Sequence, residues 1–125
     1  FLSRMQDLTH QLFSERDISV SFVHKGMESR RTIKVQVRQN LYYIFKEALN
    51  NIARHSGADR VEISMNNSDS RFRMHISDNG AGYDPANIEG GNGLRNMKMR
   101  AERIGATLEI ISRGGVEISL EMKGL

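Results

Sequence analysis

Residues 38–55, RQNLYYIFKEALNNIARH, predict the longest helix of the chain and thereby much of the fold. Apolar residues recur in this stretch at intervals of three and four, which places them on one face of a helix. This apolar stripe consists of Leu41, Ile44, Phe45, Ala48, Leu49, Ile52 and Ala53. The Ser56-Gly57 pair that follows is typical of a helix end. We therefore expect one amphipathic helix that ends near His55.

Shorter periodic segments surround this helix. Residues 2–12 and 94–104 have helical spacing. Six segments have the alternating pattern of half-buried strands: residues 18–22, 33–37, 61–65, 72–76, 108–110 and 116–122. The polar segment 24–31 is expected to connect the first two strands, and turn-forming residues at 66–70 and 113–115 predict two hairpins.

Hairpins dominate this order of elements, and the regular strand–helix alternation of a doubly wound sheet is absent. We therefore expect an α+β protein. It would be a two-layer α/β sandwich whose mixed, mostly antiparallel sheet carries its helices on one face.

Composition restricts the class of protein. The 125 residues suffice for one domain, and 38% hydrophobic with 26% charged residues is a globular balance. A net charge of +3 is too small to indicate a nucleic-acid-binding protein, so we predict no such partner. The absence of cysteine excludes disulfides and thiolate metal sites. No apolar run approaches the roughly 18 residues of a membrane span, so we expect no direct membrane contact by this domain.

A polar stripe runs beside the apolar one on the long helix. It consists of Tyr43, Glu47, Asn51 and then Arg54 or His55, spaced by three or four residues. Each residue alone fits a solvated helix face. Together they offer a carboxylate and an amide one turn apart, followed by a basic group, which suits a magnesium–triphosphate.

Asp78 ends the predicted strand 72–76 and falls on the same face as Ile76. If that face is the core, the carboxylate points into apolar surroundings and needs a partner. Asp78 could cap its own Asp-Asn-Gly turn, or it could accept a hydrogen bond from an exocyclic amino group such as that of adenine. Gly80 and Gly82 follow, where the backbone bends sharply or approaches a ligand closely.

A second glycine cluster, residues 90–93, precedes the helix predicted at 94–104. Exposed amides at such a start can bind phosphate oxygens, although a flexible loop with a helix cap has the same composition. Segment 83–90 between the clusters contains the single proline, Pro85, and could form a lid. The P-loop pattern is missing and the glycines do not open a βαβ unit, which excludes P-loop and Rossmann sites. The four histidines lack metal-like spacing, and His75 alternates away from the apolar face of its strand.

Three blocks, at residues 47–55, 78–82 and 91–94, resemble the N, G1 and G2 boxes of the GHKL superfamily, whose ATP site is called the Bergerat fold. Residues 38–122 are most similar to the catalytic ATP-binding domain of NarX/DesK-type bacterial sensor histidine kinases. The stretches EALNNIARHSGA and GNGLRNMKMRAERIGATLEI carry this resemblance.

The resemblance implies ligand contacts for residues of all three boxes: Asn51, Arg54, His55, Asp78, Gly80, Gly82, Gly91, Gly93 and Leu94. Asn51 would coordinate Mg²⁺, and Asp78 would bind the adenine amino group. The first glycine pair would shape the adenine pocket, and the second would let the lid and the helix start approach the phosphates. Glu47 and Asn51 are the candidate catalytic residues.

The function that the resemblance implies is that of a protein-histidine kinase, an ATP-dependent phosphotransferase. The domain would bind ATP with Mg²⁺ and pass the γ-phosphoryl group to a histidine on an adjacent dimerisation domain, from which it reaches a response regulator. The His-Asp acceptor box of the subfamily is absent from this chain, which begins at Phe1 and therefore reads as a piece of a longer protein.

The same resemblance predicts the organisation of the parent protein. Residues 1–15 would be the end of the preceding dimerisation helix, and 16–125 the ATP-binding domain. We expect a monomeric, cytoplasmic domain in a homodimeric parent, and these residues leave open whether that parent is anchored in a membrane.

Two other mechanisms fit the same boxes. Glu47 stands one turn before Asn51, where ATP-hydrolysing clamp proteins such as gyrase carry a general base. The chain could therefore be a GHKL hydrolase, or a serine kinase similar to anti-sigma factors. The intact Asn51, Asp78 and glycines disfavour a non-catalytic module.

Overall fold

The computed structural model describes residues 1–27, 33–80, 92–112 and 114–125. The helices in these parts of the chain are α1 (Leu2–Phe13), α2 (Val35–Asn51), the single π-helical turn η1 (Ile52–Ser56) and α3 (Asn92–Arg103). The strands are β1 (Ser19–Lys25), β2 (Arg60–Ser68), β3 (Arg71–Asp78), β4 (Thr107–Ser112) and β5 (Val116–Lys123).

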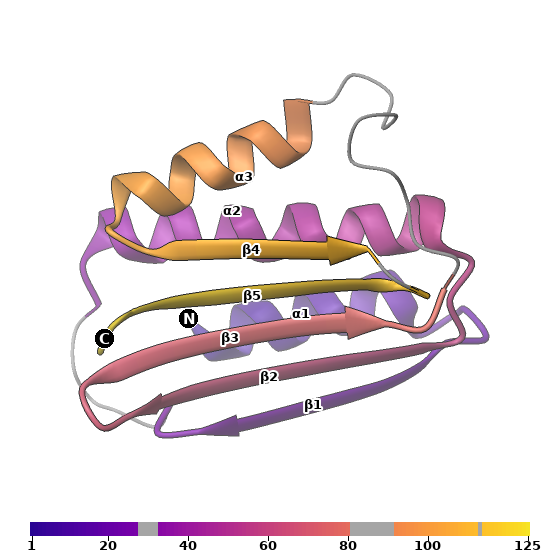
Figure 1. Cartoon of the computed structure of the whole chain (residues 1–125). Coiled ribbons are helices and arrows are strands. Elements are labelled where there is room, and N and C mark those ends of the chain that lie inside the picture. The colour runs from indigo at the N-terminus through magenta and orange to yellow at the C-terminus, as the bar shows by residue number, and fades with distance from the viewer. Residues whose placement is uncertain (28–32, 81–91, 113) are drawn as a thin grey trace.

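The five strands form one mixed sheet in the order β1-β2-β3-β5-β4. β1 runs parallel to β2, and the other three pairings are antiparallel. The helices lie together on one face of the sheet (Figure 1). The opposite face carries polar contacts, among them the ion pair Arg71–Glu121 at 3.0 Å and the hydrogen bond between His75 and Glu117 at 2.7 Å. The predicted two-layer α+β sandwich is therefore confirmed, and so is the outward position of His75.

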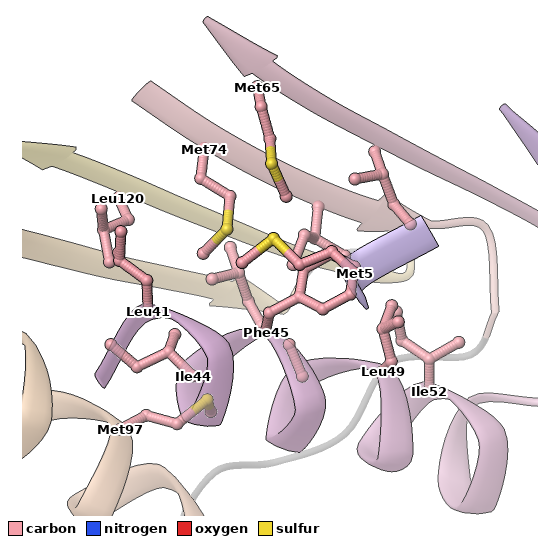
Figure 2. Packing of buried hydrophobic residues seen from close by; sticks show 14 of the residues in the cluster. Met5, Leu41, Ile44, Phe45, Leu49, Ile52, Met65, Met74, Met97 and Leu120 are labelled. Carbon is pink, nitrogen blue, oxygen red and sulfur yellow. The ribbon is translucent and has the colours of Figure 1, made fainter. Parts of the chain in front are cut away.

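The core lies between the sheet and α2. The alternating residues Val61, Ile63 and Met65 of β2 are at most 1% exposed, and the stripe of α2 is buried against them. Met5 from α1 fills the space between Phe45 and the methionines of the sheet (Figure 2). A sheet with one apolar face requires such a helical layer, since the apolar surface must be removed from water.

The predicted strand at residues 33–37 is wrong. Val35 and Val37 lie in the first turn of α2, and Val35 is 54% exposed. The alternation of three apolar residues was misleading, because Val37 continues the helical spacing toward Leu41 and Ile44. The segment after β1 therefore leads into α2, not to a second strand. Parallel strands need a crossover connection, and α2 with η1 provides it between β1 and β2.

The turn between β2 and β3 is shorter than residues 66–70, which the sequence suggested. Asn66 to Ser68 pair with β3, so only Asp69 and Ser70 form the connection. Both have positive φ, 54° and 63°. Two central residues with positive φ form the type I′ turn that matches the twist of a hairpin.

α1 packs on the same core as the other helices. Met5 is fully buried and Phe13 is 2% exposed, and the Arg4 guanidinium stacks over the Tyr42 ring of α2 at 4.0 Å. Across the described helices, none is both long and apolar enough to cross a membrane.

Candidate functional site

Two residues of the polar stripe of α2, Tyr43 and Glu47, lie against α3. Arg100 of α3 stacks over the Tyr43 ring at 3.9 Å. One turn later the Glu47 side chain reaches the start of α3, and a further turn on Asn51 is only 6% exposed. The spacing predicted that these residues share a face, but it did not indicate that α3 packs against Tyr43 and Glu47.

The contact between Glu47 and Gly93 joins the first and third sequence blocks. A Cβ atom on Gly93 would lie 2.6 Å from Oε1 of Glu47, closer than carbon and oxygen can pack. Glycine therefore permits the approach of this carboxylate to the first turn of α3, where unpaired amides favour anions. Leu94 is 8% exposed and belongs to the core, so it anchors the start of α3.

α2 ends in a change of helical form. The N–H of Ile52 is shared between the carbonyls of Ala48 and Leu49, and the π-helical turn η1 follows. Single π-turns inside helices occur often at functional sites, because they re-aim side chains and carbonyl groups. Arg54 projects from this turn and is exposed, whereas the side chain of His55 lies outside what the structure describes. Gly57 in the left-handed conformation ends the helix, as its position in the sequence predicted.

Asp78 ends β3 with its carboxyl group directed toward the interior. Oδ1 accepts a hydrogen bond of 2.8 Å from the N–H of Gly80, which closes the turn. Oδ2 is buried and has no hydrogen-bond partner in the described part of the chain. Desolvation by burial raises the pKa of Asp78, while the Gly80 hydrogen bond and the nearby amide of Val116, which forms no hydrogen bond of good geometry with Oδ2, oppose this rise. The turn-capping role is therefore real, and it leaves one buried acceptor available.

Asn79 was not identified from the sequence, although it holds the site together. Its Oδ1 accepts hydrogen bonds from the N–H groups of Asp59 at 3.1 Å and Arg60 at 2.9 Å. Its Nδ2 donates to Oδ1 of Asp59 at 2.6 Å. Asn79 thus ties the turn after β3 to the segment that follows η1. An Asp-Asn-Gly turn was recognisable in the sequence, but a partner twenty residues away was not.

Gly115 was also assigned only to a hairpin turn. Its φ is +132°, and a Cβ atom there would lie 2.1 Å from the carbonyl oxygen of Asp78. Only glycine allows β5 to begin this close to the end of β3. Asp78 and Gly115 line a hollow of about 230 Å³ at this end of the sheet, together with Ile111 and Val116.

Other predicted site residues cannot be placed. Gly82, Gly91 and the expected lid at 83–90 lie outside the described residues. Within the described chain, the structure brings Glu47 to Gly93 and Asp78 to Gly80, and Asn79 ties the turn after β3 to Asp59 in the segment after η1. The candidate site therefore has two polar ends. One end is the buried carboxylate oxygen of Asp78, and the other is the face of α2 where Glu47 meets the start of α3.

Comparisons with known proteins agree with this arrangement. A family model described as "Histidine kinase-, DNA gyrase B-, and HSP90-like ATPase" matches residues 36–124. The chain is 34% identical to the sensor histidine kinase LiaS of Bacillus subtilis and 30% identical to the sensor protein VraS of Staphylococcus aureus, each over 110 residues. These matches cover 87% of this chain but only 28% and 31% of the relatives, so the chain spans less than a third of their length.

Solved structures show the same fold. The blue-light activated histidine kinase of Erythrobacter litoralis has a TM-score of 0.77 at 18% identity, covering 97% of this chain and 40% of that one. The histidine kinase AdeS of Acinetobacter baumannii has a TM-score of 0.73 at 12% identity, and the match covers 98% of this chain and 62% of that one. At these identities the likeness concerns the fold alone, and it supports the two-layer sandwich with helices on one face.

Proposed function

This chain belongs to the family of histidine kinase-, DNA gyrase B- and HSP90-like ATPases, and from that premise we propose that it is the ATP-binding catalytic domain of a two-component sensor histidine kinase. The curated relatives are a sensor histidine kinase and a sensor protein, which supports this choice within the family. The γ-phosphoryl group of ATP would pass to a histidine on a dimerisation domain outside this chain.

The observation that carries the proposal is the unpartnered oxygen of Asp78. A buried acceptor without a donor is unfavourable, and a ligand N–H would satisfy it. The exocyclic amino group of adenine is such a donor, whereas guanine presents a carbonyl oxygen at the equivalent position. A carboxylate acceptor at this point therefore favours adenine nucleotides over guanine nucleotides.

The phosphates would lie toward the other end of the site. Asn51 offers a neutral amide oxygen, a ligand type that Mg²⁺ accepts, and we assign the metal to it. When bound, Mg²⁺ neutralises charge on the phosphates. Arg54 is exposed at the adjacent π-turn, where its guanidinium could contact a phosphate, and Gly93 leaves the backbone of the α3 start accessible beside Glu47. For His55, Gly80, Gly82 and Gly91 we retain the contacts that the resemblance implies.

The parent protein would supply the remaining partners. We propose a homodimeric sensor kinase whose dimerisation domain carries the acceptor histidine, and a response regulator that receives the phosphoryl group. The domain itself would be a cytoplasmic monomer. Light scattering on the 125-residue chain checks the last point, and a stable dimer would contradict it.

Calorimetry tests the adenine assignment. We expect the chain to bind ADP and ATP with Mg²⁺ at a Kd between about 1 μM and 1 mM, and GTP at least about tenfold more weakly. Asp78→Asn should weaken ADP binding by about tenfold or more, because it replaces a buried charged acceptor. Asp69→Asn makes the same chemical change at the distant β2–β3 turn and should leave the Kd unchanged. Failure of the unaltered chain to bind ADP would refute the proposal, and so would an Asp78→Asn variant that unfolds without a selective loss.

A further inference from the structure

Arg16 connects the segment before β1 to the π-helical end of α2. Its Nη1 donates a hydrogen bond of 3.0 Å to the carbonyl oxygen of Ala53. Arg16 lies in the turn between α1 and β1, in none of the three sequence blocks, and 37 residues separate it from its partner. An exposed arginine whose donor is held on a main-chain carbonyl fixes the position of that carbonyl.

The carbonyl that accepts this hydrogen bond belongs to η1, the turn that directly follows the candidate metal ligand. Ala53 is in η1, two residues after the buried Asn51 and next to Arg54. The π-helical turn begins at Ile52, so the backbone hydrogen-bond spacing changes here from that of α2. Arg16 gives this single turn a hydrogen bond from outside the helix.

The segment after η1 is held from other directions. Asn79 bonds to Asp59 and Arg60, and the N–H of Ser19 donates to the carbonyl of Asp59 at 2.8 Å. These bonds act on the residues that lead into β2, whereas Arg16 acts on η1 itself. Loss of Arg16 should therefore affect the metal end while the Asp78 end keeps its hydrogen bonds.

We propose that Arg16 is a positioning residue, which orients η1 and thereby Asn51 and Arg54 for the magnesium–phosphate part of the nucleotide. The inference rests on the proposed function of this site. It predicts that removal of the guanidinium lowers the contribution of Mg²⁺ to nucleotide binding more than it lowers metal-free binding. A general loss of stability would affect both conditions equally.

The experiment compares three variants of the 125-residue chain with the unaltered one. Arg16→Met keeps the length of the stem and removes the donors, and Arg16→Lys restores a donor. Arg4→Met is the matched control, because it removes an equal charge from a guanidinium that stacks on Tyr42 away from η1. Calorimetry gives the Kd of ADP with excess Mg²⁺ and with EDTA, and the ratio of the two values is the magnesium enhancement.

We expect Arg16→Met to reduce the magnesium enhancement by about three- to tenfold, the loss of one solvent-exposed hydrogen bond, with metal-free binding changed less than about twofold. Arg16→Lys should recover most of the enhancement, and Arg4→Met should retain it fully. An unchanged enhancement in Arg16→Met, or an equal reduction in Arg4→Met, would overturn the proposal.

A second measurement separates this inference from the proposed function. Amide hydrogen exchange of the nucleotide-free chain should be faster at residues 52–58 in Arg16→Met than in Arg4→Met. Equal exchange at these residues would overturn the positioning role even if nucleotide binds. Conversely, a chain that binds no ADP but shows the exchange difference would refute the proposed function and leave Arg16 as a structural support alone, contrary to the proposal.

Discussion

Asp78 has two carboxylate oxygens in different environments, one hydrogen-bonded within its turn and one buried without a partner. Strand alternation was enough to predict that the side chain points inward, because side chains of a strand alternate between its faces. It could not predict that Gly80 satisfies one oxygen only. That outcome depends on how β5 passes the end of β3, with Gly115 against the Asp78 carbonyl.

The raised pKa of Asp78 predicts a pH dependence of stability. Burial raises its pKa in the folded chain above the ordinary value of 3.8, while the unfolded chain keeps the ordinary value. Between these two values the folded state binds more protons than the unfolded state, so stability falls as pH rises. We therefore expect the nucleotide-free chain to gain stability relative to Asp78→Asn as pH falls through the raised pKa.

Thermal unfolding of both proteins from pH 7 toward about pH 3, below the ordinary pKa, measures this difference. The comparison with Asp78→Asn subtracts the other titrating groups, since that variant keeps them all. The difference in melting temperature should become constant below the ordinary pKa. A difference that is independent of pH, or that changes in the opposite sense, would mean that Asp78 is not desolvated.

Gly93 provides a second test at the scale of one residue. Gly93→Ala places a methyl group where Oε1 of Glu47 lies, and a flexible carboxylate can rotate away. Alanine also favours the helix by about 1 kcal/mol, so we expect unchanged or slightly higher stability. The position of Glu47 is lost, and we expect Mg-ADP binding to weaken to a similar extent in Gly93→Ala and in Glu47→Ala. Thermal unfolding and calorimetry measure the two effects.

The same variants distinguish kinase from hydrolase. A kinase domain separated from its acceptor should hydrolyse ATP slowly, with Glu47→Ala and Gly93→Ala close to the unaltered chain. Fast multiple turnover that both variants abolish would instead identify Glu47 as a general base for water. A Gly93→Ala chain that unfolds would show that the backbone, and not Glu47, requires glycine here.

At the scale of elements, prediction depended on how long each pattern was. The stripe of α2 contains seven apolar residues with helical spacing, and the helix was predicted from it, with an expected end near His55. Residues 33–37 contain only three apolar residues, and their spacing fits a strand and a helix start equally well. In the structure α2 begins within this segment, so tertiary context determined the outcome. The π-turn η1 was missed because its residues continue the spacing of α2, and hydrogen-bond partners such as Arg16 are not encoded locally.

The β2–β3 hairpin carries avoidable backbone strain. Asp69 and Ser70 both adopt positive φ, which side chains other than Asn and Gly disfavour. We expect the double substitution Asp69→Asn with Ser70→Gly to raise the free energy of unfolding by about 1 kcal/mol, or the melting temperature by about 4 °C. Denaturant titration measures it. Ser68→Gly is the control, because Ser68 is paired in β2 and glycine there should destabilise. Equal effects of both changes would contradict the turn assignment.

At the scale of the whole molecule, the open question is where the folding unit begins. The sequence predicted a helix at residues 2–12 and assigned 1–15 to the end of a preceding dimerisation helix. The structure places α1 on the core, and Met5 lies beside Phe45 and Met74 (Figure 2). Helical periodicity cannot distinguish a helix that packs on its own domain from one that packs on a partner, because both need an apolar stripe.

Substitution of Met5 tests whether α1 stabilises this domain. If it does, Met5→Ala leaves a cavity and should lower the free energy of unfolding by about 2–5 kcal/mol. Asp7→Ala, on the exposed side of the same helix, should change it by less than about 0.5 kcal/mol. Equal, small effects would mean that α1 is only loosely attached. A large effect for Met5 alone would make α1 part of the folding unit that contains the nucleotide site. Because Arg16 lies just after α1 and bonds to η1, a shift of this helix would then reach the proposed metal end of the site through that bond.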